Sequence, residues 1–400
     1  MINNIRNRDI VIVGLQAWDT AIGSNCKNIA IEFAKDNRVL YVNYPIDRIT
    51  LLHEKNTPPI QKRLAIKRGE SDNLVKIQNN LWNLSPTRML ESINWIASGF
   101  VFDILNKINN KRFAKDIIQG IKKLGFKDFI LFNDNDIFRC YYLKELLKPA
   151  LSIYYIRDFL LGVDYWKRHG ARLEPKLIKK ADLVVANSTY LADYGKQYNK
   201  KSYYVGQGCD VSLFDETLIK DIPSDIKDVN KPIIGYVGAL FSLRLDITLL
   251  ESIAEKRRDW NLVLVGPEDE KFKNSKLHKM DNVSFLGNKD ISLLPAYIKH
   301  FDVCLNPQTI NEVTIGNYPR KIDEYLAMGK AIVATKTKAM EIFSEFTYQA
   351  ENVAGYIEMI ETGMKESTAE KANLRRKFAL THTWENNVME IYKHINEYAQ

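Results

Sequence analysis

Short apolar runs alternate with helical periodicity from the start of the chain. Asp9–Gly14 and Val39–Asn43 are almost wholly apolar, and Ile29–Lys35 between them repeats apolar side chains at helical spacing. Continuous apolar runs of this length are typical of strands that a parallel sheet buries on both faces. The alternation continues at Phe129–Phe132, Leu151–Ile156 and Leu183–Ala186. The first half is therefore predicted to be a doubly wound α/β domain.

A second alternating set follows a charged segment, residues 213–230, that contains Pro223 and no long apolar period. Its apolar runs are Pro232–Gly238, Leu262–Gly266, Val283–Gly287, Val303–Leu305 and Ala331–Thr335. Glycine directly after a strand lets the backbone approach a ligand, and open α/β sheets bind ligands at the carboxyl ends of their strands. We therefore expect Gly238 and Gly266 to lie at a binding site.

These patterns divide the chain into four parts. We predict domains at residues 1–212 and 231–378, joined by a linker at 213–230, and a terminal helix within 379–400. The terminal segment has apolar residues at helical spacing, which predicts a packed helix: Trp384, Val388, Ile391, Tyr392 and Ile395.

Composition fits a two-domain globular protein: 400 residues, 46% hydrophobic and 26% charged. The net charge of +8 favours anionic partners without choosing among them. The four cysteines are scattered and the six histidines lack ligand spacing, so we expect a reduced cytosolic compartment and no metal site. Since neither a signal peptide nor a run of membrane-spanning length is evident, we expect a protein that is neither secreted nor integral to a membrane.

The segment Gly316–Thr335 predicts a loop, a short helix and a strand. Pro319 suits the first helical position and Gly329 the position after the last turn. Lys321 adds a positive charge to the first turn, where helices favour anions, and Glu324 lies on the same face. A ligand whose phosphates contact Lys321 and whose hydroxyl contacts Glu324 would explain this pattern. The alternative is a solvated helix with an ordinary Lys/Glu pair.

Several motifs resemble one family in order and spacing. They are Gly235–Gly238 with Arg244 downstream, Asn282–Gly287, the Tyr318–Lys330 segment, Ala181–Ser188, Gly208–Phe214 and the helix that opens at Thr383. Together they resemble bacterial GT-B glycosyltransferases of the retaining, group 1 type, over nearly the whole chain.

The resemblance implies two doubly wound Rossmann-like domains facing a central cleft, with a carboxyl-terminal helix that packs back on the first domain. It implies a nucleotide-diphosphate sugar donor on the second domain, a glycan or lipid-linked acceptor on the first, and a role in cell-surface polysaccharide synthesis without metal or cofactor. By position, Lys321 and Arg244 match the cations on the donor diphosphate, and Glu324 matches the carboxylate on the ribose. The donor-binding residues implied are Gly238, Gly266, Gly316, Asn317, Tyr318, Lys321 and Glu324.

One position departs from the family pattern. Retaining members often carry a glutamate eight positions before the residue matched by Glu324, and this chain has Gly316 there. Either Gly316 and Asn317 contact the sugar, or Glu312 reaches it from a shifted loop. The departure leaves open a non-catalytic binding relative. A nucleotide-sugar epimerase or hydrolase on the same fold is a further alternative.

The first domain offers acceptor-side candidates after its strands. Trp18 and Asp19 follow the first strand, in a loop that lacks the G-x-G-x-x-G pattern of nicotinamide dinucleotide sites. Asp134 lies in Asn133–Asp136, which formally contains D-x-D, and Asp158 follows Arg157 after another strand. Trp18 could stack on a sugar, Asp19 and Asp134 could orient hydroxyls, and Asp158 is a catalytic candidate. A packing loop, a helix cap and a buried ion pair are the respective structural alternatives.

Residues 89–105 are apolar and aromatic and lie between basic stretches. Helices of this kind either lie on anionic membranes or belong to the core. Peripheral contact with the inner face of the membrane is thus one interpretation and a core helix the other. No basic stripe with interleaved aromatics is evident, which disfavours a nucleic-acid partner.

Overall fold

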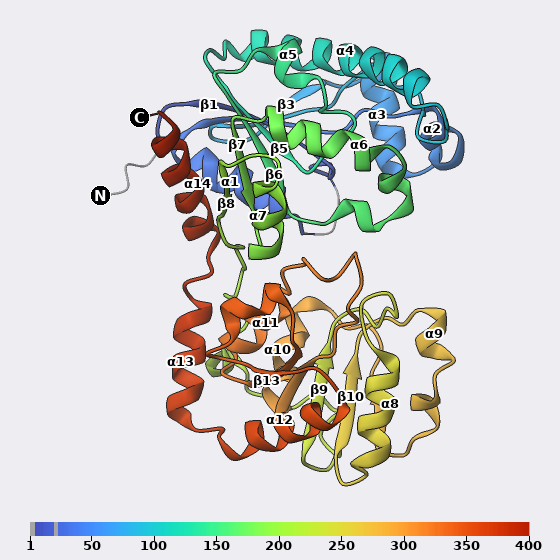
Figure 1. Cartoon of the computed structure of the whole chain (residues 1–400), viewed down its shortest axis with the longest axis vertical. Coiled ribbons are helices and arrows are strands. Elements are labelled where there is room, and N and C mark those ends of the chain that lie inside the picture. Colours follow the sequence, from blue (N-terminus) through green and yellow to red (C-terminus); the bar gives the residue numbers. More distant parts are fainter. Residues whose placement is uncertain (1–4, 20–22, 400) are drawn as a thin grey trace. The chain divides into compact units, whose positions relative to one another are not determined.

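The computed structural model describes residues 5–19 and 23–399, and it divides the chain into two compact units (Figure 1). Unit 1 comprises residues up to Gly206 together with the segment from Trp384, and unit 2 runs from Gln207 to Thr383. Each unit is built on one largely parallel sheet. The predicted pair of Rossmann-like domains is thereby confirmed.

Unit 1 has an eight-stranded sheet in the order β3-β4-β2-β1-β5-β6-β7-β8 (Figure 1). All neighbouring strands pair in parallel except β3 and β4, so the antiparallel pair forms one edge. The strands are β1 (Asp9–Gly14), β2 (Arg38–Val42), β3 (Leu74–Gln78), β4 (Leu81–Leu84), β5 (Ile130–Asp134), β6 (Leu151–Ile156), β7 (Leu183–Ala186) and β8 (Ser202–Tyr204).

Helices cover both faces of this sheet, which is why the central strands β1, β5 and β6 are buried at every position. Ile10 and Ile12 of β1 pack with α1, while Val11 and Val13 pack on the opposite face with α4 and α5. The helices of unit 1 that precede Gly206 are α1 (Asn25–Asp36), α2 (Arg48–Glu54), α3 (Pro58–Arg68), α4 (Gly99–Leu124), α5 (Leu143–Leu147), α6 (Asp164–Lys180) and α7 (Thr189–Lys196).

The terminal helix α14 (Trp384–Ala399) belongs to unit 1 and packs beside α1 (Figure 1). Its predicted apolar face is buried in the same core as Phe33 of α1, whose ring stacks on Tyr392. The Tyr392 hydroxyl also accepts a 2.8 Å hydrogen bond from Asn37 Nδ2. The prediction of a helix that returns to the first domain is confirmed.

Unit 2 has a six-stranded parallel sheet in the order β11-β10-β9-β12-β13-β14. Its strands are β9 (Ile233–Val237), β10 (Asn261–Val265), β11 (Val283–Phe285), β12 (Val303–Asn306), β13 (Ala331–Thr335) and β14 (Tyr348–Ala350). Its helices are α8 (Ile247–Lys256), α9 (Glu270–Lys273), α10 (Leu294–His300), α11 (Lys321–Ala327), α12 (Val353–Lys365) and α13 (Ala369–Ala379). Short 3₁₀ turns occur in both units, at Leu160–Gly162, Glu216–Leu218, Lys276–Lys279, Ile291–Leu293 and Lys338–Phe343.

The segment predicted as a linker packs against unit 2. Phe214 and Ile226 are buried in one core with Ile233 and Tyr297, so their side chains fix residues 213–230 to the unit. The division between the units lies at Gly206, earlier than the predicted residue 212, and at Trp384, later than the predicted residue 379.

Residues 89–105 do not form one helix. Residues 91–98 have no regular secondary structure, and α4 begins at Gly99, where Ser98 caps it by accepting from Val101 N. None of the helices in the described ranges is both long and apolar enough to cross a membrane.

Candidate functional site

Two glycines end neighbouring strands of unit 2 in a left-handed backbone conformation. Gly238 follows β9 with φ +139°, and Gly266 follows β10 with φ +151°. A Cβ on Gly266 would lie 1.9 Å from the carbonyl oxygen of Gly238. Because no side chain fits there, the two strand ends present bare backbone at the carboxyl edge of the sheet.

Lys321 lies beside this bare backbone. Its Nζ donates a 2.8 Å hydrogen bond to the Tyr236 hydroxyl and lies 4.7 Å from the centre of that ring. A Cβ on Gly238 would approach the same Nζ to 3.2 Å. The structure therefore brings together Lys321 and Gly238, two of the predicted donor-binding residues, and adds Tyr236, which sequence reasoning missed although it lies inside the G-Y-V-G motif.

The helix that carries Lys321 is shorter than predicted. It begins at Lys321 rather than Pro319 and ends before Gly329, whose φ is +69°. Since α11 has seven residues, the full charge of the lysine contributes more to anion binding here than the helix dipole does.

Two buried contacts hold α11 on the sheet. The Tyr325 hydroxyl accepts a 2.8 Å hydrogen bond from the backbone N–H of Val237, at the end of β9. Asp323 is completely buried and accepts from the Tyr318 hydroxyl at 2.8 Å, and its other oxygen lies 2.6 Å from His382 Nδ1. The hydroxyl of Tyr318, which was predicted as a donor-binding residue, therefore helps to hold α11 in place through Asp323.

Glu324 is largely buried on the same helix. Its nearest ion-pair partner is Arg320, whose guanidinium lies 3.9 Å away. Burial raises the pKa of the Glu324 carboxyl, and the charges of Arg320 and Lys321 oppose that shift. This burial contradicts the alternative of a solvated helix with an ordinary surface pair.

Arg244 is exposed in the turn before α8, and the structure ties this turn to the loop that leads to Gly316. Thr309 N donates to the carbonyl of Arg244 at 2.9 Å, and Asn311 Nδ2 donates to the carbonyl of Leu243 at 2.8 Å. Within the described ranges, the Arg244 guanidinium forms no hydrogen bond or ion pair. A cation is thus available beside the loop.

Unsatisfied amides occur at the same edge. Asn306 ends β12, and its buried Nδ2 has no hydrogen-bond partner among the described residues. The buried Oδ1 of Asn317 is likewise unpartnered there. Gly316 is buried, whereas Glu312 is exposed. Buried polar atoms without partners are costly, so these amides favour a polar ligand.

Asp134 is a buried charge in unit 1. It ends β5, and the Arg157 Nε lies 2.9 Å from its Oδ1. Burial raises the pKa of this carboxyl, and the Arg157 charge opposes the shift. A completely buried carboxylate has no surface for an acceptor hydroxyl, so the structure does not support the acceptor-side role predicted for Asp134. Asp158, which is partly exposed, lies 3.6 Å from the other end of Arg157.

Trp18 and Asp19 are held inside unit 1. The Trp18 ring lies edge-on to Tyr41 at 5.2 Å, and the backbone N–H of Trp18 donates to Asn43 Oδ1. The Asp19 carboxylate lies 3.4 Å from the buried guanidinium of Arg63. Part of their loop, residues 20–22, lies outside the described residues.

Both carboxylates of the D-x-D pattern form ion pairs with arginines. Asp136 is buried against Arg139, and Asp134 against Arg157. No group of three or more His, Cys, Asp or Glu side chains in the described part of the chain is placed to share a metal ion.

Residues 231–370, which lie in unit 2, match the family model described as "Glycosyl transferases group 1". Unit 2 carries a group 1 glycosyltransferase domain. The chain is also 24% identical over 234 residues to a Bacillus subtilis (strain 168) protein provisionally named teichuronic acid biosynthesis glycosyltransferase TuaH. That match covers 55% of this chain and 58% of the relative, so the chain spans little more than half of the relative's length.

Several solved structures resemble nearly the whole chain. Sucrose-phosphate synthase from Thermosynechococcus elongatus matches with a TM-score of 0.64 at 13% identity, covering 98% of this chain and 99% of that chain. Anabaena HepE in complex with UDP matches with a TM-score of 0.65 at 13% identity, covering 98% and 100%. At such identity the likeness shows the fold, and the predicted GT-B fold class is confirmed.

Proposed function

We propose that this chain transfers a sugar from a nucleotide-diphosphate sugar to a glycan or lipid-linked acceptor in cell-surface polysaccharide synthesis. The observation that carries the proposal is the amine of Lys321 next to the bare backbone of Gly238 and Gly266 at the carboxyl ends of β9 and β10. Such an edge suits a diphosphate, because backbone N–H groups and a cation both favour anionic oxygens. The HepE structure that the chain resembles contains UDP.

In the proposed reaction, the bond between the anomeric carbon of the donor and its phosphate oxygen breaks, and the diphosphate leaves with the electron pair. The acceptor oxygen bonds to that carbon and loses its proton. Negative charge therefore grows on the diphosphate, and fixed cations there stabilise the transition state more than the bound donor. We assign this role to Lys321 and Arg244, propose that Glu324 binds the ribose, and assign Asp158 a catalytic role.

The first test measures UDP binding by calorimetry to the full chain and to Lys321→Ala. Loss of a charge-assisted contact of about 1.5–3 kcal/mol predicts a 10- to 100-fold weaker affinity. Lys336→Ala is the control, because Lys336 is an exposed lysine of unit 2 that pairs with Glu351 at the surface. Equal affinity of wild type and Lys321→Ala for every nucleotide sugar tested would refute the proposed donor site.

Two finer features of the proposal concern the chemistry. We propose that transfer retains the anomeric configuration and needs no metal, since two cations are assigned to the diphosphate. NMR of the product would give the configuration, and the turnover rate in excess EDTA should equal the rate without it. An inverted product or an EDTA-sensitive rate would overturn the respective statement.

Gly316 favours one alternative, a non-catalytic nucleotide-sugar-binding relative, because the chain lacks a carboxylate where retaining members often carry one. Donor binding without turnover across a broad acceptor panel would establish it. Donor consumption without any acceptor would instead indicate the epimerase or hydrolase interpretation.

We also propose that the inner face of an anionic membrane is a peripheral partner of unit 1. Support comes from an exposed apolar and basic face of α4.

A further inference from the structure

A cavity of ≈ 590 Å³ opens in unit 1, and its lining includes Asp136 but not Trp18, Asp19, Asp134 or Asp158. Five parts of the chain line it: the start of α2 with the loop before it, the irregular segment before α4, the first half of α4, the turn after β5 and the first turns of α6. Its volume falls within the range of small-molecule sites, about 300–1,000 Å³. Nothing in the donor chemistry of unit 2 accounts for it.

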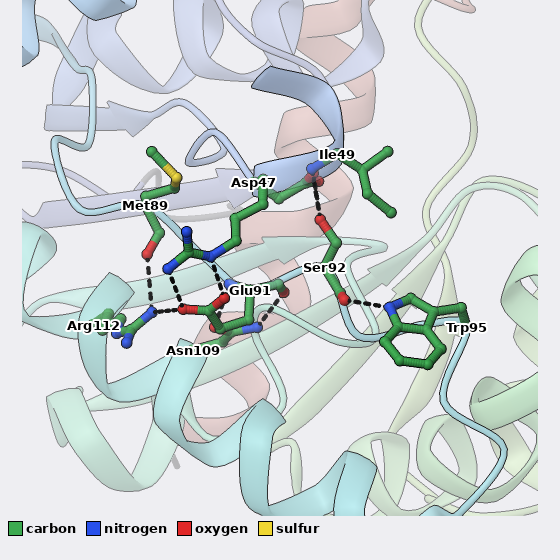
Figure 2. A network of polar contacts seen from close by, with 9 residues as sticks. Asp47, Ile49, Met89, Glu91, Ser92, Trp95, Asn109 and Arg112 are labelled. Carbon is green, nitrogen blue, oxygen red and sulfur yellow. Dashed lines mark hydrogen bonds and ion pairs between the residues drawn. The ribbon is translucent and has the colours of Figure 1, made fainter. Parts of the chain in front are cut away.

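Aromatic faces form one side of the cavity. Trp95 is 68% exposed, yet its ring is held in place because Nε1 donates a 2.8 Å hydrogen bond to the carbonyl of Ser92 (Figure 2). Tyr165 is 56% exposed and lies edge-on to Trp166, which itself stacks on Phe138. Large aromatic surfaces that are both rigid and open suit a flat apolar ligand face at low entropic cost.

Two carboxylates in the cavity walls, those of Glu91 and Asp136, already form ion pairs with arginines of the protein. Figure 2 shows Glu91 and Arg112 facing each other, and the Glu91 carboxylate also accepts from Arg48. Hydrogen bonds from Arg48 and Arg112 lower the pKa of Glu91 to about 2, so the carboxylate stays ionised and paired. Asp136 is paired with Arg139 in the same way. A neutral ligand leaves these pairs intact.

Polar atoms without partners remain in the walls. Asn106 is only 2% exposed and lines the cavity, and its Oδ1 accepts from Asn110 while its Nδ2 has no partner among the described residues. The buried Oδ1 of Asn94 is also unpartnered there, although its Nδ2 donates to the carbonyl of Tyr165. One donor and one acceptor are therefore available to hydroxyl groups of a ligand.

We infer that this cavity binds a neutral sugar ring of the glycan acceptor, stacked on Trp95 and Tyr165 and hydrogen-bonded to Asn94 and Asn106. A pyranose offers an apolar C–H face together with hydroxyls that both donate and accept. The C–H face suits the exposed aromatic rings, and the hydroxyls suit the unpartnered amide atoms of Asn94 and Asn106. The inference rests on the proposed function, because it names the class of acceptor.

The test is saturation-transfer NMR and calorimetry on the full chain with cellobiose, maltose, chitobiose and the matching methyl glycosides as probes. Trp95→Ala and Tyr165→Ala should each weaken the affinity for the best probe about tenfold, as expected for loss of one stacking contact. Trp95→Phe keeps an aromatic face without the indole N–H, and it should restore most of the affinity. Phe100→Ala is the control, since Phe100 is an exposed aromatic close in sequence that does not line the cavity.

Undiminished saccharide binding by Trp95→Ala and Tyr165→Ala, or no binding of any probe by the wild type, overturns the inference. Loss of binding to anionic phosphatidylglycerol vesicles in Trp95→Ala, with saccharide affinity unchanged, also overturns it, in favour of a lipid contact. UDP affinity is measured in parallel. Saccharide binding in a chain that fails to bind any nucleotide would contradict the proposed donor site and leave the sugar cavity standing.

Discussion

At the scale of single residues, Glu174 is the clearest case of a side chain whose protonation is set by its surroundings. It is almost completely buried in α6 and accepts hydrogen bonds from the hydroxyls of Tyr154 at 2.7 Å and Tyr194 at 3.1 Å. Burial raises the pKa of Glu174 from 4.5 to about 7, and both tyrosine hydrogen bonds oppose the shift. Desolvation therefore outweighs two good hydrogen bonds.

This shift gives unit 1 a pH-dependent stability with a defined sign. The folded state holds the proton more tightly than the unfolded chain, so the contribution of Glu174 falls as pH rises from about 4.5 to about 7. At about 1.4 kcal/mol per pKa unit, the full change is about 3 kcal/mol. Glu174→Gln should remove it, and urea unfolding of both proteins at pH 5 and pH 8 measures the difference.

Glu145→Gln is the control, because Glu145 is an exposed glutamate of unit 1 that pairs with Lys180 at the surface. If wild type and Glu174→Gln lose stability by the same amount between the two pH values, Glu174 does not titrate in this window.

At the scale of elements, α4 has one exposed face that is apolar near its start and basic further along. Its first turns expose Phe100, Val101, Ile104 and Ile108, of which Phe100 is 75% exposed. Exposed lysines follow on the same helix: Lys107, Lys111 and Lys115. Phe102 points into the core instead, so the helix is amphipathic even though only part of residues 89–105 belongs to it. Apolar and basic groups together suit an anionic lipid surface.

We expect the wild-type chain to sediment with vesicles that contain phosphatidylglycerol and not with vesicles of phosphatidylcholine alone. The double variant Phe100→Ala/Ile104→Ala should lower the partition coefficient at least about 100-fold, because two apolar side chains that the membrane buries contribute about 1.5–3 kcal/mol each. Leu374→Ala, an exposed apolar residue of unit 2, is the matched control. Equal sedimentation with neutral and anionic vesicles, or no effect of the double variant, would contradict the membrane proposal.

At the scale of the whole molecule, the chain leaves unit 1 at Gly206 and returns to it at Trp384, so the stability of unit 1 depends on residues at both ends of the sequence. Ile391 of α14 is completely buried in a core shared with α1 and β1. Ile391→Ala should destabilise unit 1 by about 2–5 kcal/mol through lost burial and the cavity it leaves. Hydrogen exchange should rise in β1 and α1 and stay unchanged in β9 and β10.

Glu385→Gln changes an exposed position of the same helix and serves as the control. A uniform rise of exchange in both units after Ile391→Ala would mean that the units unfold as one, against the division described above.

Much of the fold could be predicted from the sequence because the deciding signals are local. Continuous apolar runs mark strands covered on both faces, and a helical apolar period marks α14. Gly238 and Gly266 could be assigned to strand ends from their position directly after apolar runs, and the positive φ that both adopt there favours glycine. For the same reason Gly329 marked the end of α11 correctly.

What only the tertiary structure decided is which polar groups are buried and what they pair with. Asp134 and Asp158 both follow apolar runs in the sequence. In the structure, Asp134 is buried against Arg157, whereas Asp158, at the other end of Arg157, is partly exposed. The sugar cavity combines five parts of the chain between residues 45 and 168, so no local sequence pattern predicts it. Periodicity reports the local environment of a residue, whereas burial, ion pairing and cavities arise from contacts between distant residues. The sequence therefore predicts the sheets and the glycines, and tertiary packing selects the groups available for chemistry.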